Sequence, residues 1–174
     1  MNTSHDLVST VGDYAHALTA GYSAHATTAG YSAHATTAGD YAHWATTGSY
    51  AYATTTGNDA HATATGGHAH AATTGHFSHA LTAGDEADAT TAGNYAHALT
   101  AGARAKTSAT GANSIAVAVG ANSYARAAAG GFIVLAQYDE DTVVAVKTAQ
   151  VGKDGIKPDT WYTLSPTGEF VEAE

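Results

Sequence analysis

A glycine recurs at every ninth residue from Gly12 to Gly120, and this spacing limits what the chain can fold into more than any other feature of the sequence. If each Gly is position one of a nine-residue unit, position four is always Ala or Ser and position eight is always Thr or Ala. Position six is Ala in every unit except at Trp44 and Thr107, whereas positions three, five and seven vary freely. A repeat this regular predicts a solenoid in which each unit stacks on its neighbours.

Inside each unit the residue type alternates with a period of two, which is the period of a β-strand. The small residues at positions four, six and eight would pack closely against a second layer, while positions three, five and seven face water. We expect position nine, the Gly and position two to form a tight turn, where Gly permits a positive φ or a close approach. The recurring Gly and the paired β-branched Thr disfavour a helix, and the fixed residue type at each position disfavours disorder.

Two charge pairs indicate how many units make one coil. Glu86 and Arg104 both occupy position three and lie eighteen residues apart. Asp88 and Lys106 both occupy position five and have the same separation. With two units per coil, each pair consists of direct neighbours in a parallel ladder, where opposite charges stabilise the sheet. The sequence therefore predicts an all-β fold: a parallel β-solenoid, or β-roll, with two nine-residue strands per eighteen-residue coil and a small antiparallel β cap at its C-terminal end.

The composition excludes several other classes of protein. Only 12% of the residues are charged, the mean hydropathy is -0.14, and Ala supplies much of the apolar fraction, so an ordinary core of large side chains is excluded for most of the chain. There is no apolar run long enough for a membrane span, and the first residues, MNTSHDLVST, do not have the pattern of a secretory signal. The absence of Cys excludes disulfides and thiolate metal sites. We expect no secretion by a signal peptide and no membrane partner.

Position five alternates between the two predicted sheets and places five His in one unbroken column, the His ladder. Its members are His25, His43, His61, His79 and His97. Imidazole is a common metal ligand, but a parallel ladder holds equivalent side chains about 4.8 Å apart without converging on one point. We therefore favour a stacked ladder with no metal and no cofactor, and keep a metal-binding array as an alternative. Since like charges repel, we expect the stacked imidazoles to resist protonation and acid to weaken the solenoid.

Two other ligands suggested by the repeat are disfavoured by its details. Calcium-binding nonapeptide rolls carry an Asp in nearly every turn, whereas the turns here carry Asp only at Asp13, Asp40 and Asp85. Threonine is frequent at position seven and suggests an ice-binding array, but apolar residues interrupt its columns. These are Leu18, Ala45, Ala72, Leu81 and Leu99.

Apolar residues replace polar ones at the outward positions of three successive coils, on the same face as the His ladder. This predicted interaction patch consists of Phe77, Leu81, Tyr95, Leu99, Ile115 and Val117. An apolar patch on an otherwise solvated sheet is expected to be covered. We expect the chain's own tail or a symmetry-related copy to cover it, with a foreign protein partner as the alternative.

Trp44 departs from the repeat because it occupies position six, which is Ala in nearly every other unit. A side chain of this size does not fit a position that faces a second layer closely. A local β-bulge would accommodate it, and a contact site is the other interpretation; both stay open at this point.

The two ends of the chain differ from the repeat. Residues 1–11 are predicted to form an N-terminal cap with a partial first coil, and residues 12–129 the solenoid. Residues 130–174 carry eight carboxylates against three Lys and contain the segments FIVLAQY, VVAVKTAQV, TWYTL and EFVEAE. These segments predict a four-stranded antiparallel meander with a conventional apolar core, whose first hairpin turns at 139–142.

Two resemblances add to this interpretation. The segment GANSIAVAVGANSYARAAAGG, residues 111–131, resembles the head repeats of trimeric autotransporter adhesins, and this implies a β-roll that assembles as a trimer. The tail, with its strings IKPDTWYTL and GEFVE, resembles the closing module of uncharacterised bacteriophage and prophage proteins, in which it follows Ala/Thr/Gly-rich nonapeptides. This second resemblance implies a phage origin, and with it a location in the host-cell cytoplasm or in a virion.

No catalytic constellation is visible in the sequence. Ser, His and Asp occupy repeated surface positions and do not converge, and residues 1–103 contain no Lys or Arg that could form a basic patch for nucleic acid. We expect a non-enzymatic protein, phage- or prophage-encoded, that acts through contacts with a protein partner or with itself, as a dimer or trimer, with antagonism of a host defence factor as one candidate role. A structural or adhesive virion component is the first alternative, and a metal- or ice-binding array is the second.

Overall fold

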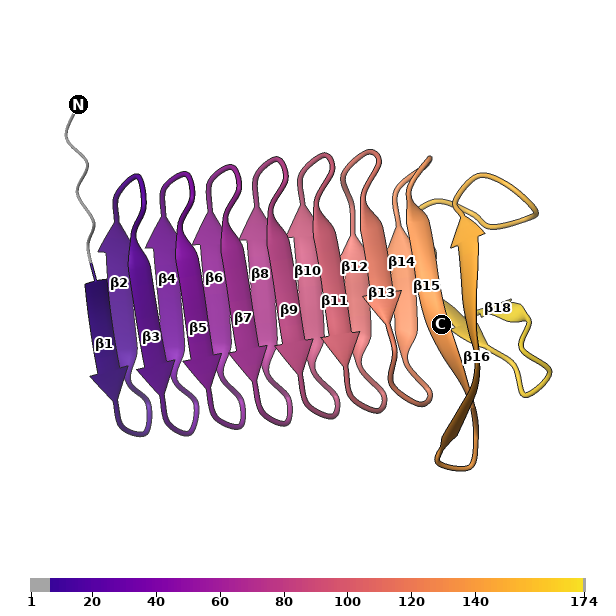
Figure 1. Cartoon of the computed structure of the whole chain (residues 1–174), viewed down its shortest axis with the longest axis horizontal. Coiled ribbons are helices and arrows are strands. Elements are labelled where there is room, and N and C mark those ends of the chain that lie inside the picture. Colours follow the sequence, from indigo (N-terminus) through magenta and orange to yellow (C-terminus); the bar gives the residue numbers. More distant parts are fainter. Residues whose placement is uncertain (1–6, 174) are drawn as a thin grey trace.

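The computed structural model describes residues 7–173, which form two sheets stacked face to face along one solenoid axis (Figure 1). Each sheet has nine strands, and no helix is found in residues 7–173. Successive strands along the chain alternate between the two sheets. The predicted all-β parallel solenoid with antiparallel strands at its C-terminal end is therefore confirmed. No helix of the described residues could span a membrane.

Sheet A contains the odd-numbered strands together with the last long strand of the chain. In spatial order these are β1 (Leu7–Val11), β3 (His25–Ala29), β5 (His43–Thr47), β7 (His61–Thr65), β9 (His79–Ala83), β11 (His97–Ala101), β13 (Ile115–Ala118), β15 (Phe132–Asp139) and β16 (Thr142–Gln150). All neighbours from β1 to β15 are parallel, and β16 returns antiparallel to β15.

Sheet B contains the even-numbered strands and the end of the chain. Its members are β2 (His16–Ala20), β4 (His34–Ala38), β6 (Tyr52–Thr56), β8 (His70–Thr74), β10 (Asp88–Ala92), β12 (Lys106–Ala109), β14 (Tyr124–Ala127), β17 (Tyr162–Leu164) and β18 (Phe170–Glu172). The register pairs His16 with His34 and Asp88 with Lys106, a separation of eighteen residues in both cases. The coil period inferred from the charge pairs is thus confirmed.

Each strand begins later in its nine-residue unit than the alternation of residue types predicts. From β2 to β11 the strands run from position five to position nine, β12 to β14 end at position eight, and the turn contains the Gly and positions two and three. Position three has a left-handed backbone, with φ of 60° at Tyr41 and 57° at Phe77. The expectation that position three faces out from the sheet and that position nine begins the turn is therefore wrong. The free choice of residue at position three reflects an exposed turn.

The Gly is required because successive coils approach each other at the turn. A Cβ placed on Gly48 would lie 2.0 Å from the carbonyl oxygen of Gly30, and the φ of Gly48 is 144°. An L-residue is strained in that backbone region, and the contact leaves no room for a methyl group. The close approach recurs at the repeat Gly residues from Gly30 to Gly120 and the positive φ at most of them, which explains the spacing of the Gly residues.

Polar side chains at position two hold neighbouring turns together. Oδ1 of Asp40 accepts a hydrogen bond of 2.8 Å from the backbone N–H of Asn58, and Oδ1 of Asn58 accepts one of 3.0 Å from that of His76. On the opposite edge, Asp13 and Asp85 accept the equivalent bonds from backbone N–H groups of the next coil, those of Tyr31 and Ala103. The Asp residues at position two thus accept backbone hydrogen bonds from the next coil. Because position three belongs to the turn, Asp59 is also a turn residue, and the expectation that the turns carry Asp only at Asp13, Asp40 and Asp85 is wrong.

The space between the sheets is filled mainly by Ala at positions four and six and Thr at position eight. The hydroxyls of Thr100 and Thr107 are 2.7 Å apart, whereas those of Thr37 and Thr55 have no hydrogen-bond partner among the described residues. Buried hydroxyls reduce the net gain from burial. Cohesion of the slab therefore rests largely on the backbone ladders.

Trp44 is accommodated without a bulge. Its side chain points between the sheets and is only 3% exposed. Strand β5 keeps a regular register on both sides, with Trp44 opposite Ala26 and Ala62. The predicted bulge is therefore wrong. Because Trp44 is buried, a direct contact role for its side chain is also disfavoured; the small Ala on each side leave it space.

The two ends of the chain continue the sheets. Residues 7–11 of the predicted N-terminal cap form β1, a partial coil in register with β3, while residues 1–6 lie outside the described residues. The predicted hairpin at 139–142 is present between β15 and β16. The expected meander, however, is divided: β15 and β16 extend sheet A, whereas β17 and β18 extend sheet B. Large buried side chains of this module form the expected apolar core. They are Ile133, Leu135, Val151, Ile156 and Tyr162.

Candidate functional site

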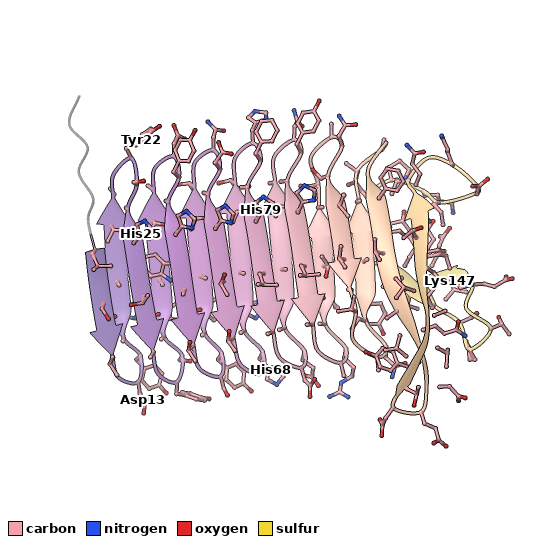
Figure 2. The ribbon with its side chains drawn as sticks, viewed as in Figure 1. Asp13, Tyr22, His25, His68, His79 and Lys147 are labelled. Carbon is pink, nitrogen blue, oxygen red and sulfur yellow. The ribbon has the colours of Figure 1, made fainter. Side chains whose placement is uncertain are left out.

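The His ladder lies on the outer face of sheet A, with its rings stacked along the solenoid axis (Figure 2). Ring centroids are 5.0 Å apart between His25 and His43 and 5.1 Å apart between His79 and His97. The two central steps, through His61, are 4.7 Å each. Interplanar angles between 5° and 16° show that the rings are nearly parallel. The predicted stacked ladder is confirmed.

Stacking makes protonation of the inner rings less favourable. The pKa values of His43, His61 and His79 are lowered from the usual His value, first by burial and then by repulsion from neighbouring His of the ladder. Asp59, in the turn before β7, opposes this effect at His61 and His79 and raises their pKa. The sequence anticipated the repulsion, but burial between stacked rings is the larger cause.

Parallel stacking also limits what the ladder can bind. Within residues 7–173, no group of three or more His, Asp or Glu side chains is arranged so that it could hold a metal ion. Each inner ring turns its two faces to its neighbours in the ladder, so the rings do not converge on a common point. This geometry suits contact with an extended surface.

A shallow groove runs beside the ladder on sheet A. The residues that line it include His61, His79 and His97 of the ladder together with Leu81, Leu99 and Val117. Leu81 and Leu99 are directly opposed in the ladder and are 37% and 36% exposed. The groove is thus an apolar strip flanked by stacked imidazoles, at outward positions five and seven.

The predicted interaction patch is brought together only in part. Leu81, Leu99, Ile115 and Val117 share the outer face of sheet A, in two adjacent columns. Phe77 and Tyr95 lie instead in the turns at the edge, stacked on each other with centroids 5.3 Å apart.

The chain's own tail does not cover this patch, contrary to one expectation. Strand β15 continues the two columns, since Phe132 pairs with Ile115 and Val134 pairs with Val117. The apolar strip therefore extends from Leu81 to β15, with exposed Phe132 at its end. The predicted patch does not include this extension, because the sequence places Phe132 and Val134 in the C-terminal cap; the apolar run FIVLAQY is the signal that could have revealed it.

Within residues 7–129 the charged side chains of the strands all lie in sheet B, and Glu86 and Arg104 lie in the turns before β10 and β12. Arg104 and Glu86 form the predicted ion pair at 2.8 Å, and the other oxygen of Glu86 lies 3.3 Å from Nδ1 of His68. Asp88 is the ladder neighbour of Lys106, as predicted, but its carboxylate lies 3.2 Å from Nδ1 of His70. No ion pair between Asp88 and Lys106 is found within residues 7–173.

One contact between the solenoid and the C-terminal module was not anticipated. The guanidinium of Arg126 lies over the ring of Trp161, 4.6 Å from its centroid, and Nε of Arg126 donates a 2.9 Å hydrogen bond to Ser108. Cation–π stacking of this kind stabilises by roughly 0.5–1 kcal/mol at exposed sites. It fixes the module on sheet B, opposite the apolar strip.

Outward positions of the two sheets thus differ in chemistry. On sheet A, positions five, seven and nine from β1 to β13 contain no Lys, Arg, Asp or Glu.

Comparisons with protein-family models, with curated proteins and with solved structures found no match to this chain. The functional interpretation therefore rests on the residues and geometry described above.

Proposed function

We propose that this protein is a non-enzymatic binding protein that acts through protein–protein contacts made by the outer face of sheet A. The observation that carries the proposal is the exposed apolar strip of Leu81, Leu99 and Val117 beside the His ladder. Exposed apolar strips on a solvated sheet are typical of interaction sites.

The chemistry of this face favours a protein surface over other ligands. From β1 to β13 the outward positions of this face carry no formal charge at neutral pH, so they lack the cations that a nucleic-acid partner requires. Aromatic rings and apolar side chains with few charges are the composition of the centre of a protein interface. The ladders hold these side chains on a rigid sheet, which reduces the entropy lost on binding.

The biological setting is part of the same proposal. The resemblance of the tail to closing modules of phage and prophage proteins supports a phage origin. A rigid binding surface without catalytic residues would act by occupying a host protein, and antagonism of a host defence factor in the cytoplasm is the role that fits such blocking.

The test is capture of a partner by the immobilised protein from a lysate of the bacterial host. The double variant Leu81→Asp, Leu99→Asp places two charges in the strip without changing the inward face. The matched control is Thr36→Asp, Thr54→Asp, at the same repeat position on sheet B. We expect the control to retain the captured protein and the strip variant to lose it. Equal capture by both variants would reject the strip as the binding site.

A structural component of the virion is the second candidate, and the stacked, open-ended form of the solenoid supports it. Mass spectrometry of purified particles separates the two candidates. A stoichiometric presence in particles favours the virion component, whereas its absence from particles together with capture of a host protein favours the binding protein.

A further inference from the structure

The two ends of the solenoid are finished differently. At the C-terminal end, sheet A closes with the antiparallel hairpin β15–β16 and sheet B with β17–β18. At the N-terminal end, β1 is the last strand of sheet A and β2 is the last strand of sheet B. Among the described residues, neither strand has a neighbour on its outer side.

The C-terminal edges carry the features that prevent pairing between sheets of different molecules. The register of β15 and β16 is interrupted between Gln137 and Tyr138, β16 contains Lys147, and Lys157 pairs with Glu172 of β18. Irregular registers and charges on edge strands are typical protection. Strands β1 and β2, LVSTV and HALTA, contain no Lys, Arg, Asp, Glu or Pro.

The unprotected edges are also apolar. Leu7 is 78% exposed, Val11 is 84% exposed and Leu18 is 76% exposed. All three occupy outward positions of β1 or β2 and are far more exposed than Leu81 and Leu99 in the strip. A flat, uncharged edge with exposed apolar side chains is a template for strand addition.

The hydrogen-bonding pattern shows which backbone groups are free at this edge. The N–H of Gly12 donates toward the next coil, to Ala29, and that of His34 donates back toward the preceding coil, to Ala15. Because N–H directions alternate along a strand, residues 7, 9 and 11 of β1 and residues 16, 18 and 20 of β2 direct their N–H and C=O groups to the free edge.

We propose that the N-terminal end is a homodimer interface, in which β1 of one copy pairs antiparallel with β2 of a second copy. Strand β1 lies outermost and β2 lies further in, so the free edges form a step, and the two strands run in opposite directions (Figure 1). A two-fold axis parallel to the strands places each β1 beside the partner's β2. Both steps are then filled at once, and each sheet A continues into the sheet B of the other copy.

The register of this pairing brings the exposed apolar residues together. Centring the two five-residue strands places Ser9 opposite the partner's Leu18, with Leu7 and Val11 as its diagonal neighbours. No charged side chain of either strand enters the interface. The contact is isologous, and the closed C-terminal ends point away from it, so the assembly stops at two copies.

Disulfide cross-linking tests the register directly, because the natural chain has no Cys. Opposed residues of an antiparallel hydrogen-bonded pair have Cα atoms about 5.5 Å apart, within the range of a disulfide. We expect a mixture of Ser9→Cys and Leu18→Cys chains to form a covalent dimer on mild oxidation, and neither chain to do so alone. Self-linking of either single variant without the mixed product would overturn the arrangement.

Light scattering coupled to size-exclusion chromatography tests the interface itself. We expect the wild-type chain to have twice its 17.4 kDa mass, and Leu18→Lys to be monomeric at the same concentration. The control is Thr36→Lys, the ladder neighbour of Leu18 in β4, which should remain dimeric. A monomeric wild type, a larger assembly, or a dimeric Leu18→Lys would each overturn the proposal. The strip on sheet A is a separate surface, so loss of the dimer leaves the proposed function to be judged by its own test.

Discussion

Arg104 donates two hydrogen bonds, from Nε at 3.0 Å and from Nη2 at 2.8 Å, to the same oxygen of Glu86, its ladder neighbour one coil earlier. Both side chains are substantially exposed, since 59% of Arg104 and 42% of Glu86 is accessible. The pair aligns two turns on the edge of sheet B without being shielded from water. The geometry of the pair is well defined, but its contribution to the free energy of unfolding is the small one expected of an exposed ion pair.

The first prediction concerns this pair. We expect Arg104→Ala to lower the free energy of unfolding by only about 0.5 kcal/mol, because exposed ion pairs stabilise weakly and salt screens them. Chemical denaturation at low and high ionic strength measures the change. A loss several times larger, or one that is insensitive to salt, would contradict the assignment of a surface pair.

The second prediction separates backbone strain from close approach at the turns. Gly12 and Gly48 have nearly the same φ, 143° and 144°, but a Cβ on Gly12 would meet nothing within 4 Å. We expect Gly12→Ala to cost roughly 1–3 kcal/mol from strain alone. Gly48→Ala should cost clearly more, because its methyl group would overlap the carbonyl of Gly30. Equal losses in thermal and denaturant unfolding would show that the contact between coils has no part in the requirement for Gly.

The third prediction concerns pH. The pKa values of His43, His61 and His79 are lowered in the folded state, so the unfolded chain binds more protons as the pH falls. The free energy of unfolding should therefore be highest above the unfolded His pKa, about 6.5, and should decrease as the pH falls through the lower folded values.

Thermal melts across this range, with the single variant His61→Phe, check the third prediction. Phe preserves the stack but cannot be protonated, so the decrease toward acid pH should become smaller. The control is His76→Gln, in a turn outside the ladder, which should retain the wild-type decrease of thermal stability toward acid pH. An unchanged slope in His61→Phe would rule out the ladder as its source.

The fourth prediction concerns the side chains that link the turns. Oδ1 of Asn58 accepts a hydrogen bond of 3.0 Å from the N–H of His76. We expect Asn58→Ala to reduce the free energy of unfolding by about 1 kcal/mol, the usual net value of such a bond. Hydrogen exchange at the amide of His76 should accelerate. Ser49→Ala, at the same repeat position on the opposite edge, serves as the control, and an equal loss there would argue against the hydrogen bond.

Much of the solenoid follows from the sequence because the repeat restricts each position separately. The charge pairs at Glu86 and Asp88 indicated the coil period, since a ladder places like positions side by side. The boundaries of each strand were less visible. Position three varies in sequence as an outward strand position would, and only its left-handed φ, as at Phe77, assigns it to the turn.

The candidate site shows where sequence reasoning stops. The His ladder and the columns of Leu81 and Leu99 could be placed from spacing alone, because their partners recur at a fixed interval. The stacking of Arg126 on Trp161 joins residues in different segments with no periodic relation. The fit of Trp44 between Ala neighbours depends on how far the sheets accommodate a large ring, a property that no residue pattern encodes.

The alternation of strands between the sheets has a consequence for how such a chain can change in length. If a whole coil of two units is lost or gained, every later strand stays in the same sheet as before, so the remaining His ladder and the C-terminal module keep their surroundings. Loss of a single unit exchanges the sheets for everything that follows it. If the unit that begins at Gly57 were lost, for example, His79 and His97 would join the column of His34 and Tyr52, and β15 would lie in the other sheet. Insertions and deletions that preserve this architecture therefore come in even numbers of units.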